Sequence, residues 1–165
     1  MGTWDVGPFD NDAAADFCSD LDEAITQERE GIIRGVLTHV INAVDYLEAP
    51  ESERAVAAAA LVAAQSPGGE PADPVHGPEE PLPDLTGLRD LARQALDRVT
   101  TEPSELMELW AESNGAPWHA VVRQLRNRLL PQSSGEQLRR TPSWSPPNTS
   151  LSAPTTYGKA DRRTP

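Results

Sequence analysis

The chain has 165 residues, a net charge of −12 and one cysteine. A lone cysteine excludes an intrachain disulfide and suits a reducing compartment. The acidic charge argues against nucleic acid as a partner, because carboxylates repel phosphate. We expect a cytoplasmic protein without a membrane partner, since no basic and apolar leader opens the chain and its longest apolar run, residues 55–64, is about half of a membrane span.

The charge divides the chain into two parts. Residues 1–131 contain 24 Asp and Glu against 9 Arg, whereas residues 132–165 contain five basic and two acidic residues. Sixteen of the last 34 residues are Ser, Thr or Pro, a composition that cannot support a core. We therefore predict an acidic helical domain over residues 1–131 and a disordered tail over residues 132–165.

The first half of the domain predicts three helices. Residues 12–25 carry apolar side chains at helical spacing, with Asp10 or Asp12 available as the N-cap. The wide apolar stripe of residues 30–48, which includes Val44, predicts the central helix of the core, ended by Pro50. An alanine-rich helix follows from Ser52 to about residue 65.

Two glycines interrupt the second of these helices. Gly31 and Gly35 each cost a helix roughly 1 kcal/mol relative to alanine. Two explanations are open: a frayed first turn, or another backbone that packs closely against this face.

The second half begins with a loop over residues 66–84, where six Pro and three Gly in nineteen residues prevent a helix or a central strand. Helical spacing resumes at residues 86–101, a short helix begins with Pro103 at its first position, and a last helix runs from about Trp118 to Leu130. The predicted fold is all-α, a compact bundle of five to six helices with a disordered C-terminal tail.

The opening segment carries a distinctive motif. Gly2-Thr3-Trp4 is followed by Gly7-Pro8-Phe9 and by Asn11-Asp12 at the start of a helix, and residues 45–50 read Asp-Tyr-Leu-Glu-Ala-Pro. Over roughly residues 1–130 the chain resembles the bacterial domain of unknown function 4259 family. The chain departs from the family pattern at Asp5-Val6, where a Gly-containing pair is expected, and in its tail. The resemblance implies a helical domain and no established activity, so no catalytic residue is transferred from it.

The motif itself has a structural interpretation. Gly7-Pro8 is a turn signal that lets the chain fold back and lay the rings of Trp4 and Phe9 over the bundle. The residues assigned to this structural motif are Trp4, Gly7, Pro8, Phe9, Asp10, Asn11 and Asp12.

Three aspartates are candidate metal ligands. Asp12 and Asp16 lie one helical turn apart and Asp10 precedes the helix, a spacing that can present oxygen ligands to Mg²⁺ or Ca²⁺. The competing interpretation is helix capping beside a solvated acidic face. The metal hypothesis would make the chain a carboxylate-based, divalent-metal-dependent enzyme.

The leading functional hypothesis is an interaction module without enzymatic activity. Asp16, Asp20, Asp22 and Glu23 form an acidic face on the first helix, which would meet a basic protein partner by electrostatic steering, as an inhibitor or immunity protein does. We expect no catalytic residue and no cofactor. Cys18 lies on the apolar face and is expected to be an inert core thiol, and His39 to be a partly buried polar residue.

Overall fold

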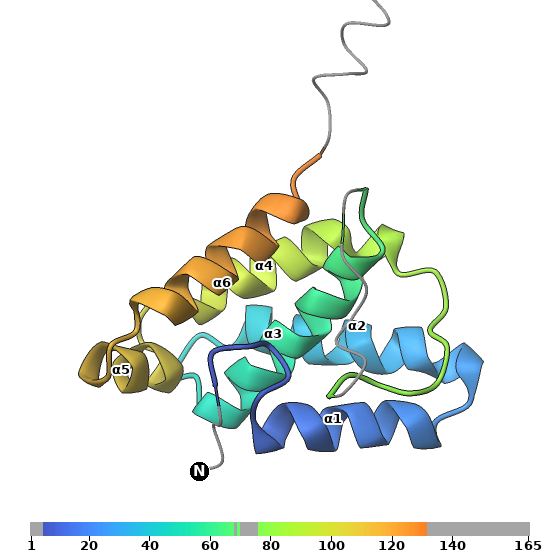
Figure 1. Ribbon diagram of the computed structural model, residues 1–165, viewed down its shortest axis with the longest axis horizontal. Coiled ribbons are helices and arrows are strands. Elements are labelled where there is room, and N and C mark those ends of the chain that lie inside the picture. The colour runs from blue at the N-terminus through green and yellow to red at the C-terminus, as the bar shows by residue number, and fades with distance from the viewer. Residues whose placement is uncertain (1–4, 68, 70–75, 132–165) are drawn as a thin grey trace, which may run out of the picture. The chain divides into compact units, whose positions relative to one another are not determined.

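The computed structural model describes residues 5–67, 69 and 76–131 of the chain. The described residues form six α-helices and no β-strand, which confirms the all-α prediction (Figure 1). The predicted tail, residues 132–165, lies outside the described residues. The elements are α1 (Asp12–Glu23), α2 (Thr26–Asn42), α3 (Ala49–Ala64), the 3₁₀ turn η1 (Thr86–Leu88), α4 (Arg89–Val99), α5 (Glu105–Glu112) and α6 (Ala116–Arg128).

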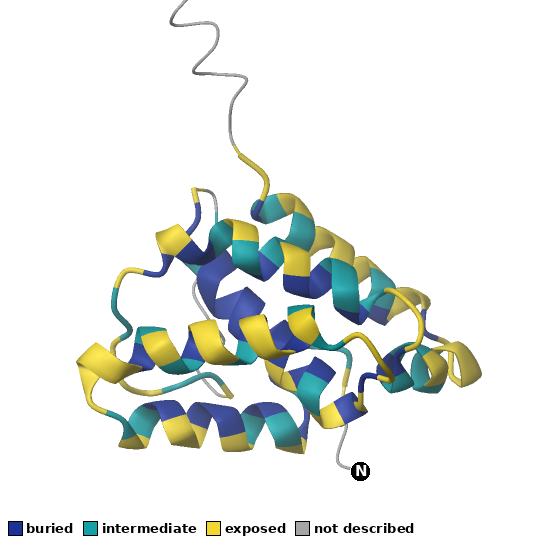
Figure 2. Cartoon of the chain, turned by 180° about the vertical axis from the view of Figure 1, so that it is seen from behind, coloured by how far each residue is buried: buried dark blue, intermediate teal, exposed yellow. Residues whose placement is uncertain are grey.

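The centre of the domain is α3. Helices α1, α2, α4, α5 and α6 all pack against it, and it is dark with buried residues along most of its length in Figure 2. Its sequence explains the burial, because the run from Ala55 to Ala63 is apolar on every side of the helix and mostly alanine, so that several neighbours can approach its backbone.

The prediction that the second helix is the core's central element was therefore wrong. Only one face of α2 is buried, the face that carries Arg29, Ile33, Leu37 and Val40. Large β-branched side chains gave that segment the strongest apolar stripe, but the alanines of α3 take the central place because small side chains allow close packing from all directions.

The end of α2 also differs from the prediction. The helix stops at Asn42, and Val44, expected to point inward, is 86% exposed. Residues 43–48 instead form a connection in which the Leu47 N–H donates to the Pro103 carbonyl (3.3 Å) and the Glu105 N–H to the Leu47 carbonyl (2.8 Å). Pro50, expected to close the helix, lies in the first turn of α3, where its missing N–H costs nothing.

Arg98, on α4, joins the connection of residues 43–48 to the loop that follows α4. Its Nε donates to the Ala43 carbonyl (2.8 Å) and its Nη2 to the Asp45 carbonyl (2.7 Å), while Nη1 donates to the Thr101 carbonyl (2.9 Å). One guanidinium therefore satisfies carbonyls from two loops at once.

The start of α5 also differs from the prediction. Pro103, predicted at its first position, precedes the helix, which begins at Glu105 after Ser104. The Glu105 carboxylate accepts a hydrogen bond from the Ala49 N–H (2.7 Å), one of the first amides of α3. The connections before α3 and α5 thus support each other.

A second arginine has a similar task at the other end of α2. Arg29 is only 4% exposed, and its guanidinium donates to the carbonyls of Leu21 (2.7 Å), Pro81 (2.8 Å) and Asp22 (3.4 Å). These bonds join the end of α1 and the loop before α4 to α2. The Asp22 carboxylate adds to the junction by accepting from the backbone amides of residues 79 and 80 at 3.1 and 2.9 Å.

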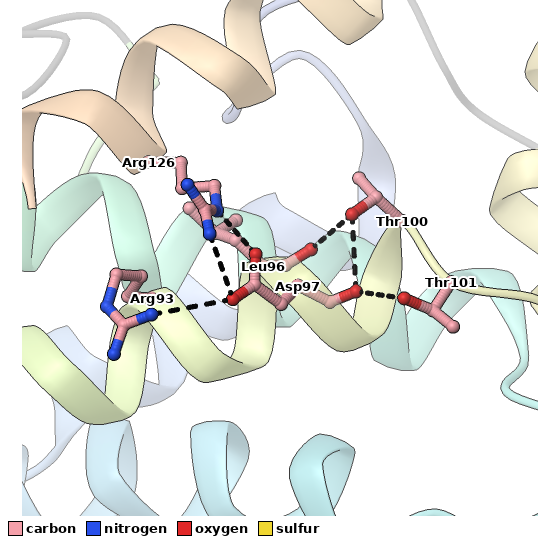
Figure 3. A network of polar contacts seen from close by, with 6 residues as sticks. All are labelled: Arg93, Leu96, Asp97, Thr100, Thr101 and Arg126. Carbon is pink, nitrogen blue, oxygen red and sulfur yellow. Dashed lines mark hydrogen bonds and ion pairs between the residues drawn. The ribbon is translucent and has the colours of Figure 1, made fainter.

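A polar network joins α4 to α6 on the outside of the bundle (Figure 3). The Asp97 carboxylate lies between Arg93, 3.7 Å away on its own helix, and Arg126 of α6, whose Nε and Nη2 both point to it. Close by, the hydroxyls of Thr100 and Thr101 donate to the carbonyls of Leu96 and Asp97 in the last turn of α4 (2.9 and 2.6 Å), where helix carbonyls run out of partners further along the helix.

No helix in the described ranges combines the length and apolar character needed to span a bilayer.

Removal of the Arg29 guanidinium should destabilise the domain strongly. Arg29→Met keeps the aliphatic volume but leaves three buried or half-buried carbonyls without a donor, so we expect a loss of about 2–4 kcal/mol in the free energy of unfolding, measured by urea denaturation. Arg34→Gln is the control, because Arg34 is exposed and, among the described residues, pairs only with Glu30 one turn away. Its loss should stay within about 0.5 kcal/mol. Equal losses in the two variants would contradict the role assigned to Arg29.

Candidate functional site

The N-terminal motif forms a tight turn that leads into α1. The Asp10 N–H donates to the Gly7 carbonyl (3.2 Å), and the Asp10 carboxylate folds back to accept from the Gly7 N–H (3.1 Å). A Cβ on Gly7 would lie 2.1 Å from that carboxylate, so a side chain there would displace it. Glycine at position 7 therefore leaves room for the Asp10 carboxylate to make this hydrogen bond.

Asn11 is the N-cap of α1, so the prediction of Asp10 or Asp12 was wrong. Its backbone is extended, and its Oδ1 accepts from the Ala14 N–H at 2.7 Å. Asp10 cannot cap because its carboxylate is turned toward Gly7. Asp12 is already the first residue of the helix, where its charge is favourable to the helix dipole but its side chain is exposed.

The motif rests on buried side chains of three other helices. Phe9 is 4% exposed, and the space enclosed by Gly7, Pro8, Asn11, Glu53 and the two tryptophans of α5 and α6 is about 10 Å³. This volume holds a single water at most, so the motif packs as part of the core and forms no ligand cavity. Trp4, also assigned to the motif, lies outside the described residues.

Two features beside the motif escaped the sequence analysis. Glu53 is only 7% exposed within the alanine-rich helix, and its position there, a carboxylate in an otherwise apolar run, was the available signal. Trp110 and Trp118 stack with ring centroids 5.8 Å apart and planes 10° apart, which joins α5 to α6. Spacing alone predicted apolar positions but not this pairing.

The three candidate metal ligands point to different surroundings. The Asp10 carboxylate bonds to the Gly7 N–H and lies 3.3 Å from the His76 ring, whereas Asp12 and Asp16 are exposed on α1. Within the described ranges no group of three or more His, Cys, Asp or Glu side chains is arranged to hold a metal ion.

The acidic face of α1 is a continuous surface of free carboxylates. Asp12, Asp16, Asp20 and Glu23 follow one another at intervals of one helical turn, and all four are exposed. None of their carboxylates has a hydrogen bond or ion pair with the part of the chain that the structure describes.

Asp22, the remaining residue assigned to this face, is used differently. Its two carboxylate oxygens accept the backbone amides of Glu79 and Glu80, so it holds the loop and is not available to a partner. The contact places two further exposed acidic residues beside the end of α1.

The position of these charges is costly for the helix. Asp20, Asp22 and Glu23 lie in the last turns of α1, where the helix dipole disfavours negative charge and α1 has no basic residue of its own. The Arg29 guanidinium of α2 reaches the Leu21 and Asp22 carbonyls at this end, but it forms no ion pair with Asp20 or Glu23. Helix stability therefore does not explain the carboxylates at this end.

The other reactive groups have structural surroundings. Cys18 is 5% exposed, and burial, with a smaller contribution from Asp22, raises the pKa of its thiol to about 12. His39 is exposed, and its Nε2 lies 2.7 Å from the Glu51 carboxylate of α3. The expectation that His39 is partly buried was wrong, because it lies on the outer face of α2.

A comparison with known protein families identifies the family of this chain. The model of a family described as a domain of unknown function (DUF4259) matches residues 2–121. The chain belongs to this family. The matched residues of the DUF4259 domain include the N-terminal motif, α1 to α5 and the first half of α6. No curated protein and no solved structure matches the chain.

The cap of the DUF4259 domain can be tested by two neighbouring substitutions. Asn11→Ala removes the side-chain acceptor of a buried amide and should lower the free energy of unfolding by about 1–2 kcal/mol in chemical denaturation. Asp12→Asn, the control, removes only an exposed charge near the helix N-terminus and should cost about 0.3 kcal/mol. A larger loss from Asp12→Asn would show that the aspartate supports the helix start.

The Cys18 thiol should be inert in the folded DUF4259 domain. With its pKa at about 12 it is protonated at pH 8 and buried, so a chromogenic disulfide reagent should label it only after denaturation. Above pH 9 the unfolded thiol ionises while the folded one stays protonated, so this group lowers stability as pH rises from 9 toward 12. Cys18→Ala should lack that component, and rapid labelling of the native protein would contradict the assignment.

Proposed function

We propose that the DUF4259 domain is a protein-interaction module that binds a basic protein through the acidic face of α1, in the manner of an inhibitor or immunity protein. Three exposed carboxylates, those of Asp16, Asp20 and Glu23, form the centre of this face. The lone cysteine is compatible with the cytoplasm as the place of binding.

The observation that carries the proposal is the placement of charge against the helix dipole. A carboxylate near a helix C-terminus costs a few tenths of a kcal/mol to about 1 kcal/mol. Arg29 offsets part of the dipole by donating to the Leu21 and Asp22 carbonyls, but no cation of the described residues forms an ion pair with Asp16, Asp20 or Glu23. A basic partner would supply the missing counter-charge. Charge complementarity of this kind raises association rates and makes them sensitive to salt.

The buried side of α1, opposite the acidic face, supports the same interpretation. Ala14, Phe17, Cys18 and Leu21 bury the opposite side of α1 against α3, each 5% exposed or less. The acidic side chains therefore project from a helix held in place before any partner binds, which reduces the entropy lost on association.

The proposal is tested by neutralising the face without changing its shape. Asp16→Asn, Asp20→Asn and Glu23→Gln are combined in one variant, and Asp45→Asn, Glu102→Gln and Glu112→Gln in a control of equal net charge. All six positions are exposed, and the control positions lie outside α1. Each tagged full-length chain is used to capture proteins from the lysate of the native host at low and high salt.

We expect the wild type and the control to retain a stoichiometric basic protein that high salt releases, and the α1 variant to lose it. The α1 variant should melt at the same temperature or higher, since two of its three substitutions, Asp20→Asn and Glu23→Gln, remove charge from a helix C-terminus. Equal capture by both variants, or capture that salt does not affect, would refute the acidic face as the binding surface.

A further inference from the structure

A second surface, unrelated to the acidic face, opens between α2 and the first turns of α3. It is a groove of about 370 Å³, a volume typical of sites for small molecules. Its lining comes from two helices: Ile32, Gly35, Val36, His39 and Val40 of α2, and Glu51 and Arg54 of α3. None of the α1 residues takes part.

The base of the groove is apolar. Val40 is buried, and Ile32 and Val36 are half-buried against the core, so their outer surfaces face the opening. The space above Gly35 is open, because a Cβ built on this residue would have no neighbour within 4 Å. The absence of a side chain at Gly35 therefore widens the groove. A larger residue would gain helix propensity at this exposed position, so no contact among the residues that the structure describes explains the glycine.

The two explanations of the α2 glycines can now be separated. The helix is complete from Thr26 onward, which excludes a frayed first turn at residues 31–35. The described part of the chain places no backbone against Gly31 or Gly35. The open face at Gly35 belongs to the groove, whereas Gly31 lies one turn away, outside it.

The rim of the groove carries one unpaired cation. His39 and Glu51 face each other at 2.7 Å and so satisfy each other. Arg54 is exposed and has neither a hydrogen bond nor an ion pair with any residue in the described ranges. Its guanidinium can therefore donate to an incoming anion.

We propose that this groove binds a small amphipathic carboxylate, with the carboxylate on Arg54 and the apolar portion against Ile32, Val36 and Val40. A guanidinium matches the two oxygens of a carboxylate with two parallel hydrogen bonds. Because Glu51 and His39 satisfy each other, Arg54 is one cation for one negative charge, which favours a singly charged carboxylate over a dianionic phosphate ester. An amphipathic cation is disfavoured because Arg54 repels it and Glu51 is already paired.

The probe for this test is decanoate, a saturated chain with one carboxylate, titrated into the full-length protein by isothermal titration calorimetry. Arg54→Gln removes the guanidinium and Gly35→Leu fills the opening. The matched controls are Arg34→Gln and Gly31→Leu, which change an exposed arginine and an exposed glycine of α2 outside the groove. Decyltrimethylammonium serves as the probe of opposite charge, and sedimentation velocity reports the oligomeric state of each variant.

We expect decanoate to bind at one site and decyltrimethylammonium to bind more weakly. Arg54→Gln should weaken decanoate binding about tenfold or more, the loss typical of one charge-assisted pair. Gly35→Leu should weaken it to a similar extent, while both controls bind as the wild type does.

The proposal is overturned if decanoate does not bind, if the cation binds as tightly, or if the controls lose affinity equally. It is also overturned if the wild type is a dimer that both glycine substitutions dissociate, because the groove would then be covered by a second copy. None of these results bears on the acidic face of α1, so the two proposals fail independently.

Discussion

The close approach of five helices to α3 is the constraint on which the rest of the domain depends. A helix surrounded by several neighbours packs closely against them where its side chains are mostly small, and the alanines of α3 meet that requirement. Each neighbour then contributes the larger groups, such as Phe17, Leu37 and Leu96, to fill the space around it. The acidic face lies on α1, a neighbour of this helix, and the groove lies between α2 and α3 itself.

The same arrangement explains which parts of the fold could be predicted. Helices α1, α4 and α6 bury a single stripe, and the spacing of apolar residues identified them, with ends within a few residues of those observed. The central role of α3 was missed because alanine contributes little to an apolar pattern, although a helix apolar on every side is one that must be buried. The exposed segment around Val44 was misassigned because the pattern continued past the point where the backbone turns.

The candidate sites, like the fold, could be predicted from the sequence only in part. Exposure of Asp16 and Asp20 follows from the periodicity of α1, but the use of Asp22 as an anchor depends on amides 57 and 58 residues away, and no local pattern reports such a contact. The observed N-cap, Asn11, lies one position from each predicted residue. Asp10 does not cap the helix because its carboxylate already accepts a hydrogen bond from the Gly7 N–H. For the groove, the glycine pair of α2 was a signal in the sequence, but its meaning required the position of Arg54 on a different helix.

Arg29 and Arg98 hold the connections of the domain mainly through main-chain carbonyl oxygens, and the one side chain that Arg29 pairs with among the described residues, Glu80, lies 3.8 Å away. Every amino acid supplies the same carbonyl oxygen, so the loops are free to change their side chains while their paths stay the same. The two arginines have no such freedom, since one guanidinium serves several acceptors at once. The exposed side chains of these loops can therefore be substituted, and new surface chemistry can arise there, without a change of fold.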